Sequence, residues 1–122
     1  MYSMKSIAIV GIVLISLCFG LDYMSNLKKK DQLQQIILQH PTIIDVRTEQ
    51  EFQAAHIKGA INIPLESLNN KYTLLNKNTT YITTCSHGIR SKKALYVLQK
   101  KGFQNVFDGG AWLGLQNLLI KK

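Results

Sequence analysis

The sequence is poor in cysteine, proline and histidine, with two, two and three of each among 122 residues. Cys18 lies inside an apolar run and Cys85 in the rest of the chain, so we expect no disulfide between them and no disulfide framework. His40, His56 and His87 are scattered and, with one cysteine nearby, have no metal-ligand spacing. The sequence therefore predicts no metal site.

Acidic residues are also scarce. Seven aspartates and glutamates stand against fifteen lysines and arginines, which gives a formal net charge of +8. Such a charge suits nucleic acid, an anionic membrane surface or a small anionic substrate. The sequence has no helix-turn-helix, zinc-finger or RNA-stacking signature, so nucleic acid is not an expected partner. Most of the lysines are expected to form a solvated basic surface.

Long apolar runs are limited to one, near the amino terminus. Residues 7–21 carry no charge, and Asp22 is the only charge as far as residue 24. At a rise of about 1.5 Å per residue, a helix over residues 7–24 is at the short end of what crosses a membrane. A signal peptide with Lys5 ahead of its apolar region is the alternative.

The charges around this run favour an uncleaved anchor over a cleaved export signal. Three lysines at residues 28–30 follow it, whereas Lys5 and the amino terminus precede it. By the positive-inside rule, the following domain is expected in the cytoplasm, while cleavage would leave it in the periplasm. We divide the chain into an anchor or signal segment (1–24), a basic linker (25–30) and a folded domain (31–122).

In the folded domain, short apolar runs alternate with helical patterns. Strands are expected at residues 42–46, 59–63, 80–84 and 105–107. Helices are expected at residues 31–39, 48–55, 64–68, 91–101 and 111–120, with a polar loop at 69–79 and a turn at 108–110. This alternation predicts an α/β domain with an open, mainly parallel sheet flanked by helices.

The chemistry is expected in the loop that joins the strand at 80–84 to the helix at 91–101. Ligands gather at the carboxyl ends of strands in a parallel sheet, and Cys85 lies at such an end. The following residues are expected to bind substrate: Ser86, His87, Gly88, Ile89, Arg90 and Ser91. A cysteine that only fills the core, which is the alternative, does not require such a loop.

Several features of this loop should stabilise a thiolate. The helix N-terminus offers unpaired N–H groups, and Arg90, Lys92 and Lys93 add positive charge, so the pKa of Cys85 should fall below about 8.5. Gly88 lets the loop curve so that its amides point inward as a cup for an anion. Arg90 can bind a sulfonate-like group in a forked fashion, and His87 either orients substrate or only covers the loop.

Loop length separates two classes of cysteine enzyme. Four residues lie between Cys85 and Arg90, one fewer than a cysteine phosphatase needs for a phosphate-sized cup. The smaller loop favours sulfur transfer over phosphate-ester hydrolysis.

Further segments surround the loop in a fixed order. They are residues 44–47 (IDVR), 51–52 (EF), 56–64 (HIKGAINIP), 102–103 (GF) and 109–112 (GGAW). Together with the six-residue loop, they resemble the rhodanese family in its single-domain form, over about residues 31–115.

The resemblance implies a rhodanese fold and a sulfurtransferase with Cys85 as nucleophile. A small anionic donor such as thiosulfate would leave its outer sulfur on Cys85 as a persulfide, with Arg90 at the anionic end of the donor. The acceptor would be cyanide, a small thiol or a protein thiol, and no metal or organic cofactor would be needed.

The resemblance also covers Asp45, Arg47, Glu51 and His56, for which we expect structural roles near the site. Asp45 and Arg47 flank a strand end, where an ion pair would fix the adjoining loop. Two other functions stay open. One is a non-enzymatic, membrane-tethered binding or sensing module, and the other is a small cysteine phosphatase or arsenate reductase.

Overall fold

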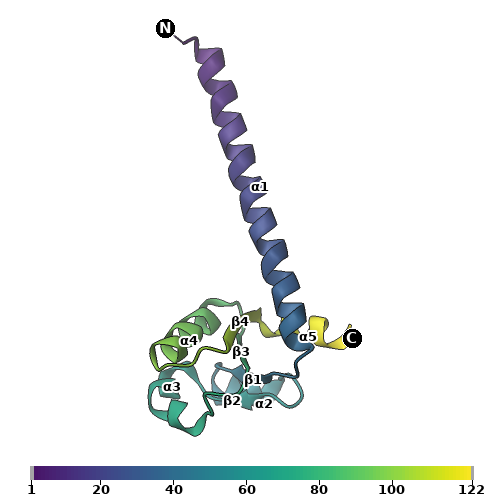
Figure 1. The fold of residues 1–122 in the computed structure, drawn as a ribbon, viewed down its shortest axis with the longest axis vertical. Helices are drawn as coiled ribbons and strands as arrows, with labels where there is room; N and C mark the ends of the chain where they lie inside the picture. The colour runs from purple at the N-terminus through teal and green to yellow at the C-terminus, as the bar shows by residue number, and fades with distance from the viewer. Residues whose placement is uncertain (1, 122) are drawn as a thin grey trace. The chain divides into compact units, whose positions relative to one another are not determined.

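The computed structural model describes residues 2–121, which divide into two compact units, Met1–Gln35 and Ile36–Lys122. Nearly all of the first unit is one helix, α1 (Met4–Ile37), drawn in purple and blue in Figure 1. Its most apolar stretch has a mean hydropathy of 2.2, and no residue of that stretch is buried. By length and composition α1 is able to cross a membrane, a property that an amino-terminal signal sequence shares.

The basic linker expected at residues 25–30 lies inside α1, as do most of the residues expected to form a separate helix at 31–39. The reason is local. Residues 25–37 contain neither glycine nor proline and are rich in lysine, glutamine and leucine, which favour the helix. The helix ends only where His40 takes a positive φ of 53° ahead of Pro41.

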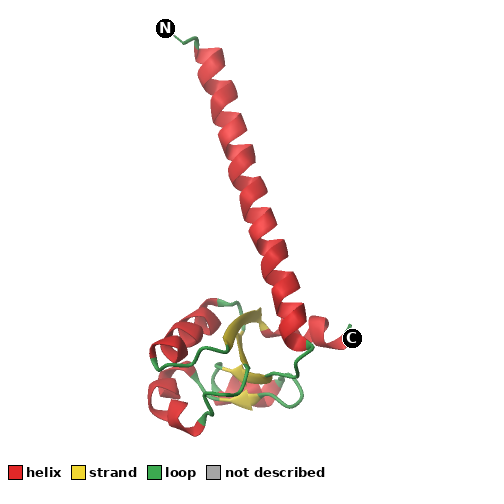
Figure 2. Ribbon diagram, viewed as in Figure 1, coloured by secondary structure: helices red, strands yellow, loops and turns green. Residues whose placement is uncertain are grey.

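The second unit is built on a four-stranded parallel sheet, shown in yellow in Figure 2. The strands are β1 (Thr42–Asp45), β2 (Ile61–Asn62), β3 (Tyr81–Cys85) and β4 (Val106–Ala111), in the order β2-β1-β3-β4. The helices are α2 (Glu49–Ala54), α3 (Leu65–Lys71), α4 (Ile89–Lys100) and α5 (Trp112–Ile120), with a 3₁₀ turn, η1 (Tyr72–Leu74). The predicted open parallel α/β fold is confirmed.

The central strands are apolar because they are covered on both faces. Every residue of β3 is buried, and Ile44 of β1 and Ile82 of β3 are fully inaccessible. Leu68 of α3 and Leu98 of α4 pack into the same core as Ile44. Parallel pairing brings the carboxyl ends of β1 and β3 to the same edge of the sheet.

The start of α2 follows the predicted capping box. The Thr48 hydroxyl accepts from the Glu51 amide at 3.2 Å, and a Glu51 carboxylate oxygen accepts from the Thr48 amide at 3.0 Å. This cap fixes the direction in which the chain leaves β1, and with it the position of the Glu51 side chain.

The prediction of a turn at residues 108–110 is wrong, because these residues belong to β4. A Cβ atom at Gly109 would lie 2.6 Å from Ile82 Cγ2, so glycine is needed there for close packing between strands. Gly110 has a φ of 69° and lies where the register shifts between the Thr83–Asp108 pair and the Cys85–Ala111 pair. This β-bulge lets β4 follow β3 to its end, where Ala111 pairs with Cys85.

Candidate active site

Cys85 is the last residue of β3, four positions before the start of α4. The residue is 1% exposed. Its sulfur accepts hydrogen bonds from the backbone amides of Gly88, at 3.0 Å, and Ser91, at 3.3 Å. Gly88 takes a φ of 92°, which turns the loop back over the sulfur. The loop therefore presents an amide cup around the thiol, the geometry expected from the sequence.

The Cys85 thiol is poised to ionise. Burial raises its pKa, but hydrogen bonds from the Ser91 amide and hydroxyl, and then from the Gly88 and His87 amides, outweigh burial and lower the pKa overall. The direction is the expected one, and among the expected causes it is the backbone N–H groups that act on the sulfur. Directed N–H groups on the sulfur lower the pKa of this thiol.

The buried carboxylate of Asp108 stabilises the loop that forms the amide cup. Ser91 donates its hydroxyl hydrogen to Asp108 Oδ1 at 2.7 Å, with the Gly88 carbonyl oxygen as a second acceptor at 3.0 Å. The Gly110 amide also donates to Asp108 Oδ1, at 2.9 Å. Sequence reasoning missed Asp108, because an aspartate ahead of two glycines is typical of a turn. It belongs instead to β4, and it fixes the first turn of α4.

Arg90 is held by Glu51 of α2. Its guanidinium donates to both carboxylate oxygens of Glu51, at 2.8 and 2.9 Å, and to the Ser86 hydroxyl at 3.1 Å. Ser86 in turn donates to Glu51 Oε1 at 3.0 Å. Arg90, the arginine predicted to bind substrate, therefore faces a carboxylate in this structure. An anion that bound at Arg90 would compete with Glu51 for the guanidinium.

The contact between Arg90 and Glu51 shifts the pKa of both side chains. The hydrogen bonds from Arg90, and after them the Thr48 amide, hold the pKa of the Glu51 carboxyl well below its ordinary range. The same contact raises the pKa of Arg90. Both side chains are about one-third exposed, so solvent screens their attraction. The Glu51 contact ties α2 to the loop.

Asp45 and Arg47 form a separate buried pair at the end of β1. Arg47 donates to both Asp45 oxygens, at 2.7 to 3.0 Å, and to the Ala55 carbonyl at 2.7 Å. The guanidinium lies 4.7 Å from the ring centroid of Trp112. The side-chain amide of Asn62 donates to the backbone carbonyls of Asp45 and Arg47. These contacts join β1, β2 and the start of α5.

The other predicted site residues lie outside the cup. The side chains of His87 and Ile89 are exposed on the loop, and 66% of Ile89 is accessible. His56 stacks on Phe52 with ring centroids 3.8 Å apart, and its Nδ1 lies 2.7 Å from the Phe52 carbonyl oxygen. The structure thus gathers the loop and Glu51 around the thiol, while His56 shapes the end of α2.

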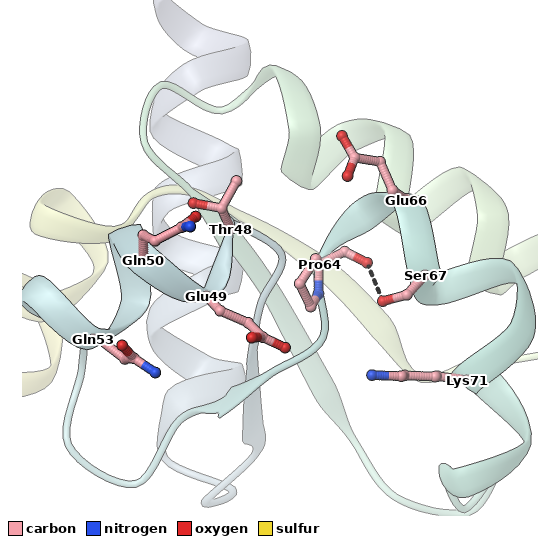
Figure 3. Close-up of a pocket in the computed structure, with 8 residues that line it drawn as sticks. All are labelled: Thr48, Glu49, Gln50, Gln53, Pro64, Glu66, Ser67 and Lys71. Carbon is pink, nitrogen blue, oxygen red and sulfur yellow. Dashed lines mark hydrogen bonds between the residues drawn. The ribbon is translucent and has the colours of Figure 1, made fainter.

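A hollow of about 490 Å³ opens between α2 and α3, beside the site. In Figure 3, Glu49 of α2 and Lys71 of α3 point toward each other across it, and Pro64 and Ser67 form one wall. Thr48 lines this hollow and also contacts Glu51, so the hollow adjoins the loop through α2. Its lining is polar and charged, and it carries no thiol.

No group of three histidine, cysteine, aspartate or glutamate side chains within residues 2–121 has the spacing of a metal site. At the candidate site itself, the Cys85 sulfur accepts hydrogen bonds from N–H donors.

Comparison with known proteins identifies relatives of the second unit. The family model described as "Rhodanese-like domain" matches residues 24–111. The thiosulfate sulfurtransferase PspE of Escherichia coli is 33% identical over 81 residues, 65% of this chain and 75% of PspE. The thiosulfate sulfurtransferase GlpE of Shewanella oneidensis is 35% identical over 74 residues, 57% of this chain and 73% of GlpE.

A third relative is longer. The putative sulfur carrier protein YrkF of Bacillus subtilis is 36% identical over 66 residues, 54% of this chain, and this chain spans only 36% of YrkF.

Solved structures are similar in fold. A rhodanese with anions from E. coli superposes with a TM-score of 0.57 at 33% identity, covering 61% of this chain and 89% of that one. The reduced CoADR-RHD of Bacillus anthracis gives 0.60 at 29% identity, covering 71% of this chain and 15% of that one.

Proposed function

Because this chain belongs to the rhodanese-like domain family, we propose that it is a sulfurtransferase that carries sulfane sulfur as a persulfide on Cys85. The observation that carries the proposal is the pair of backbone amides directed at the Cys85 sulfur, at 3.0 and 3.3 Å. Such a cup stabilises negative charge on the attacking thiolate, and again on the outer sulfur of a persulfide.

The first half-reaction loads the cysteine. The Cys85 thiolate attacks the outer sulfur of thiosulfate or a related donor, forming a new S–S bond. The original sulfur–sulfur bond of the donor breaks, and sulfite leaves with the electron pair. Loop amides receive the negative outer sulfur on Cys85. Arg90 attracts the anionic end of the donor, in competition with its Glu51 contact.

The second half-reaction removes the outer sulfur from Cys85. An acceptor thiolate attacks the outer sulfur, the persulfide bond breaks, and the Cys85 thiolate leaves with the electron pair. The acceptor becomes a persulfide, or thiocyanate when cyanide is the acceptor. Each step exchanges one bond to sulfur for another with balanced charge, so the proposed mechanism requires no metal or organic cofactor. It is a two-step covalent transfer.

We also propose that α1 anchors the protein in a membrane, with the second unit in the cytoplasm. Support comes from the exposed apolar stretch of α1 and from the three lysines at residues 28–30 that follow it. The alternative is a cleaved segment that directs the second unit to the periplasm.

The test of the sulfurtransferase is the mass of the Cys85 peptide after the full-length chain is incubated with thiosulfate. A Cys18→Ser background removes the other cysteine. We expect a gain of one sulfur on Cys85, removed by added thiol or cyanide, and no gain in the Cys85→Ser variant. Absence of the adduct with every sulfane donor tried contradicts the proposal. Efficient hydrolysis of a phenyl phosphate favours the phosphatase instead.

A further inference from the structure

One face of α4 is exposed along its whole length. Five exposed residues form a single stripe: Ile89, Lys93, Tyr96 and Lys100 follow one another at intervals of three or four residues, and Lys92 lies beside Lys93. We call these five residues the α4 face. The opposite side of the helix is buried in the core.

The α4 face combines apolar side chains with charge of one sign. Ile89 is 66% exposed and Tyr96 is 58% exposed. Lys100 Nζ lies 4.7 Å from the ring centroid of Tyr96, so a cation rests on the aromatic ring. The helix contains no aspartate or glutamate, and nothing on the α4 face neutralises its lysines.

A hollow of about 480 Å³, lined by residues of α3 and α4, runs beside the α4 face. Leu65, Val97 and Tyr96 give it apolar walls, and Lys92, Lys93 and Asn69 line the rest. At about 1.5 Å per residue, the face extends about 16 Å, which suits a segment of a protein better than a small anion. A partner that fits carries carboxylates around an apolar side chain.

The α4 face begins inside the catalytic loop. Ile89 lies between Gly88 and Ser91, whose amides contact the Cys85 sulfur. A molecule docked on the face is therefore held at the mouth of the cup. Lipid headgroups and nucleic acid backbones match the lysines but present no thiol to the persulfide.

Building on the proposed sulfurtransferase function, we propose that the α4 face is the docking surface of a protein sulfur acceptor with an acidic, partly apolar segment beside its thiol. Attraction to the lysines steers the acceptor, and burial of Ile89 and Tyr96 holds it.

The test uses two short fluorescent peptides and the full-length chain in a neutral detergent. One peptide has glutamates flanking a leucine, and the matched peptide has glutamines in their place. Anisotropy should show that the acidic peptide binds at least about fivefold more tightly than its match. The Lys93→Glu/Lys100→Glu variant should lose about tenfold in affinity for it, and Tyr96→Ala should also weaken it.

The matched control is Lys58→Glu/Lys121→Glu, which changes net charge equally at exposed positions outside α4. It should bind the acidic peptide like the unchanged protein. Equal losses in both double variants, or no preference for the acidic peptide, overturn the docking surface. The docking surface is also overturned if an anionic lipid vesicle or an RNA oligonucleotide binds through Lys93 and Lys100 as strongly as the acidic peptide does.

A transfer assay links docking to the chemistry. With a cysteine added to each peptide, sulfur transfer from preformed Cys85 persulfide should favour the acidic peptide, and Lys93→Glu/Lys100→Glu should remove that preference. Because the preference is a ratio between two matched peptides, any change in the reactivity of Cys85 itself cancels. Failure of the persulfide to form counts against the proposed function. The peptide-binding experiment tests the α4 face separately, because it does not require a persulfide.

Discussion

At the scale of single residues, the reactivity of Cys85 results from competition between burial and hydrogen bonding. Burial alone would keep the thiol protonated, as for a small core residue. Hydrogen bonds from the amides of Ser91 and Gly88 outweigh burial and lower the pKa of the thiol. The loop stays in place because Ser91 is held by Asp108 and Arg90 is held by Glu51.

The pH dependence of Cys85 alkylation follows from this competition. Because its pKa is lowered, the rate of reaction with iodoacetamide should stay high below pH 8.5, the region in which an ordinary cysteine thiol is protonated. The measurement is the alkylation rate against pH in a Cys18→Ser background. Unfolding in urea should return the midpoint to about 8.5. A folded-state midpoint at or above that value contradicts the amide-cup interpretation.

Glu51 should make stability depend on pH. Its pKa is lower in the folded than in the unfolded chain, so its contribution is present above about pH 4.3 and is lost as the pH falls through the folded-state pKa. Glu51→Gln should therefore reduce the free energy of unfolding near neutral pH, by no more than about 1 kcal/mol for so exposed a pair. The deficit should shrink near pH 3.

The measurement is urea unfolding in neutral detergent, followed by the fluorescence of Trp112, the single tryptophan of the chain. Glu49→Gln on the same helix is the matched control and should show a smaller, less pH-dependent effect. If the loss of stability in Glu51→Gln grew toward acidic pH, the folded-state pKa of Glu51 would not be lowered, and the prediction would be wrong.

At the scale of elements, the end of β4 decides whether the cup can form. Asp108 reaches Ser91 because β4 continues through the two glycines and bulges opposite the end of β3. A turn at the same residues would take the carboxylate away from α4. The close approach of Gly109 to Ile82 keeps β4 beside β3.

Gly109→Ala should therefore be destabilising. Its added methyl group would lie 2.6 Å from Ile82 Cγ2, 2.9 Å from Leu115 Cδ2 and 3.0 Å from the Thr83 carbonyl oxygen. We expect a loss of about 1–3 kcal/mol in the free energy of unfolding, from the same urea experiment. Gly114→Ala in α5 is the control, because no atom lies within 4 Å of its Cβ. It should be neutral or stabilising by up to about 1 kcal/mol. Equal effects of the two substitutions would contradict the packing argument.

At the scale of the whole molecule, the chain joins a long helix with an apolar stretch to a small rhodanese-like domain. The proposed anchor would place sulfur transfer at a membrane surface, and the excess of lysine suits an anionic one. Interaction with that surface and docking on α4 are separate proposals that use different lysines.

Cell fractionation tests the anchor. The full-length chain should sediment with membranes and resist alkaline carbonate extraction, because its apolar stretch is long enough to span the bilayer. Protease added from the cytoplasmic side of inverted vesicles should digest the second unit, while intact spheroplasts should protect it. A shortened, soluble product in the periplasm would identify residues 1–24 as a cleaved signal.

The sequence by itself determined the features that depend on neighbouring residues. Strand and helix alternation, the capping box at Thr48 and the position of Cys85 ahead of a helix are all local patterns, and the structure has each of them. The residues expected to form a basic linker, 25–30, are helical, because a helix without breakers continues through a change in charge.

Only the tertiary structure decided which distant side chains meet. Glu51 and Arg90 are separated by 39 positions, and Ser91 and Asp108 by 17. Their contacts depend on strand order, register and the bulge in β4, which no local pattern specifies. The sequence thus determined that a cysteine loop follows a strand. Packing of α2 and β4 against that loop decided which groups hold Arg90 and Ser91 in place.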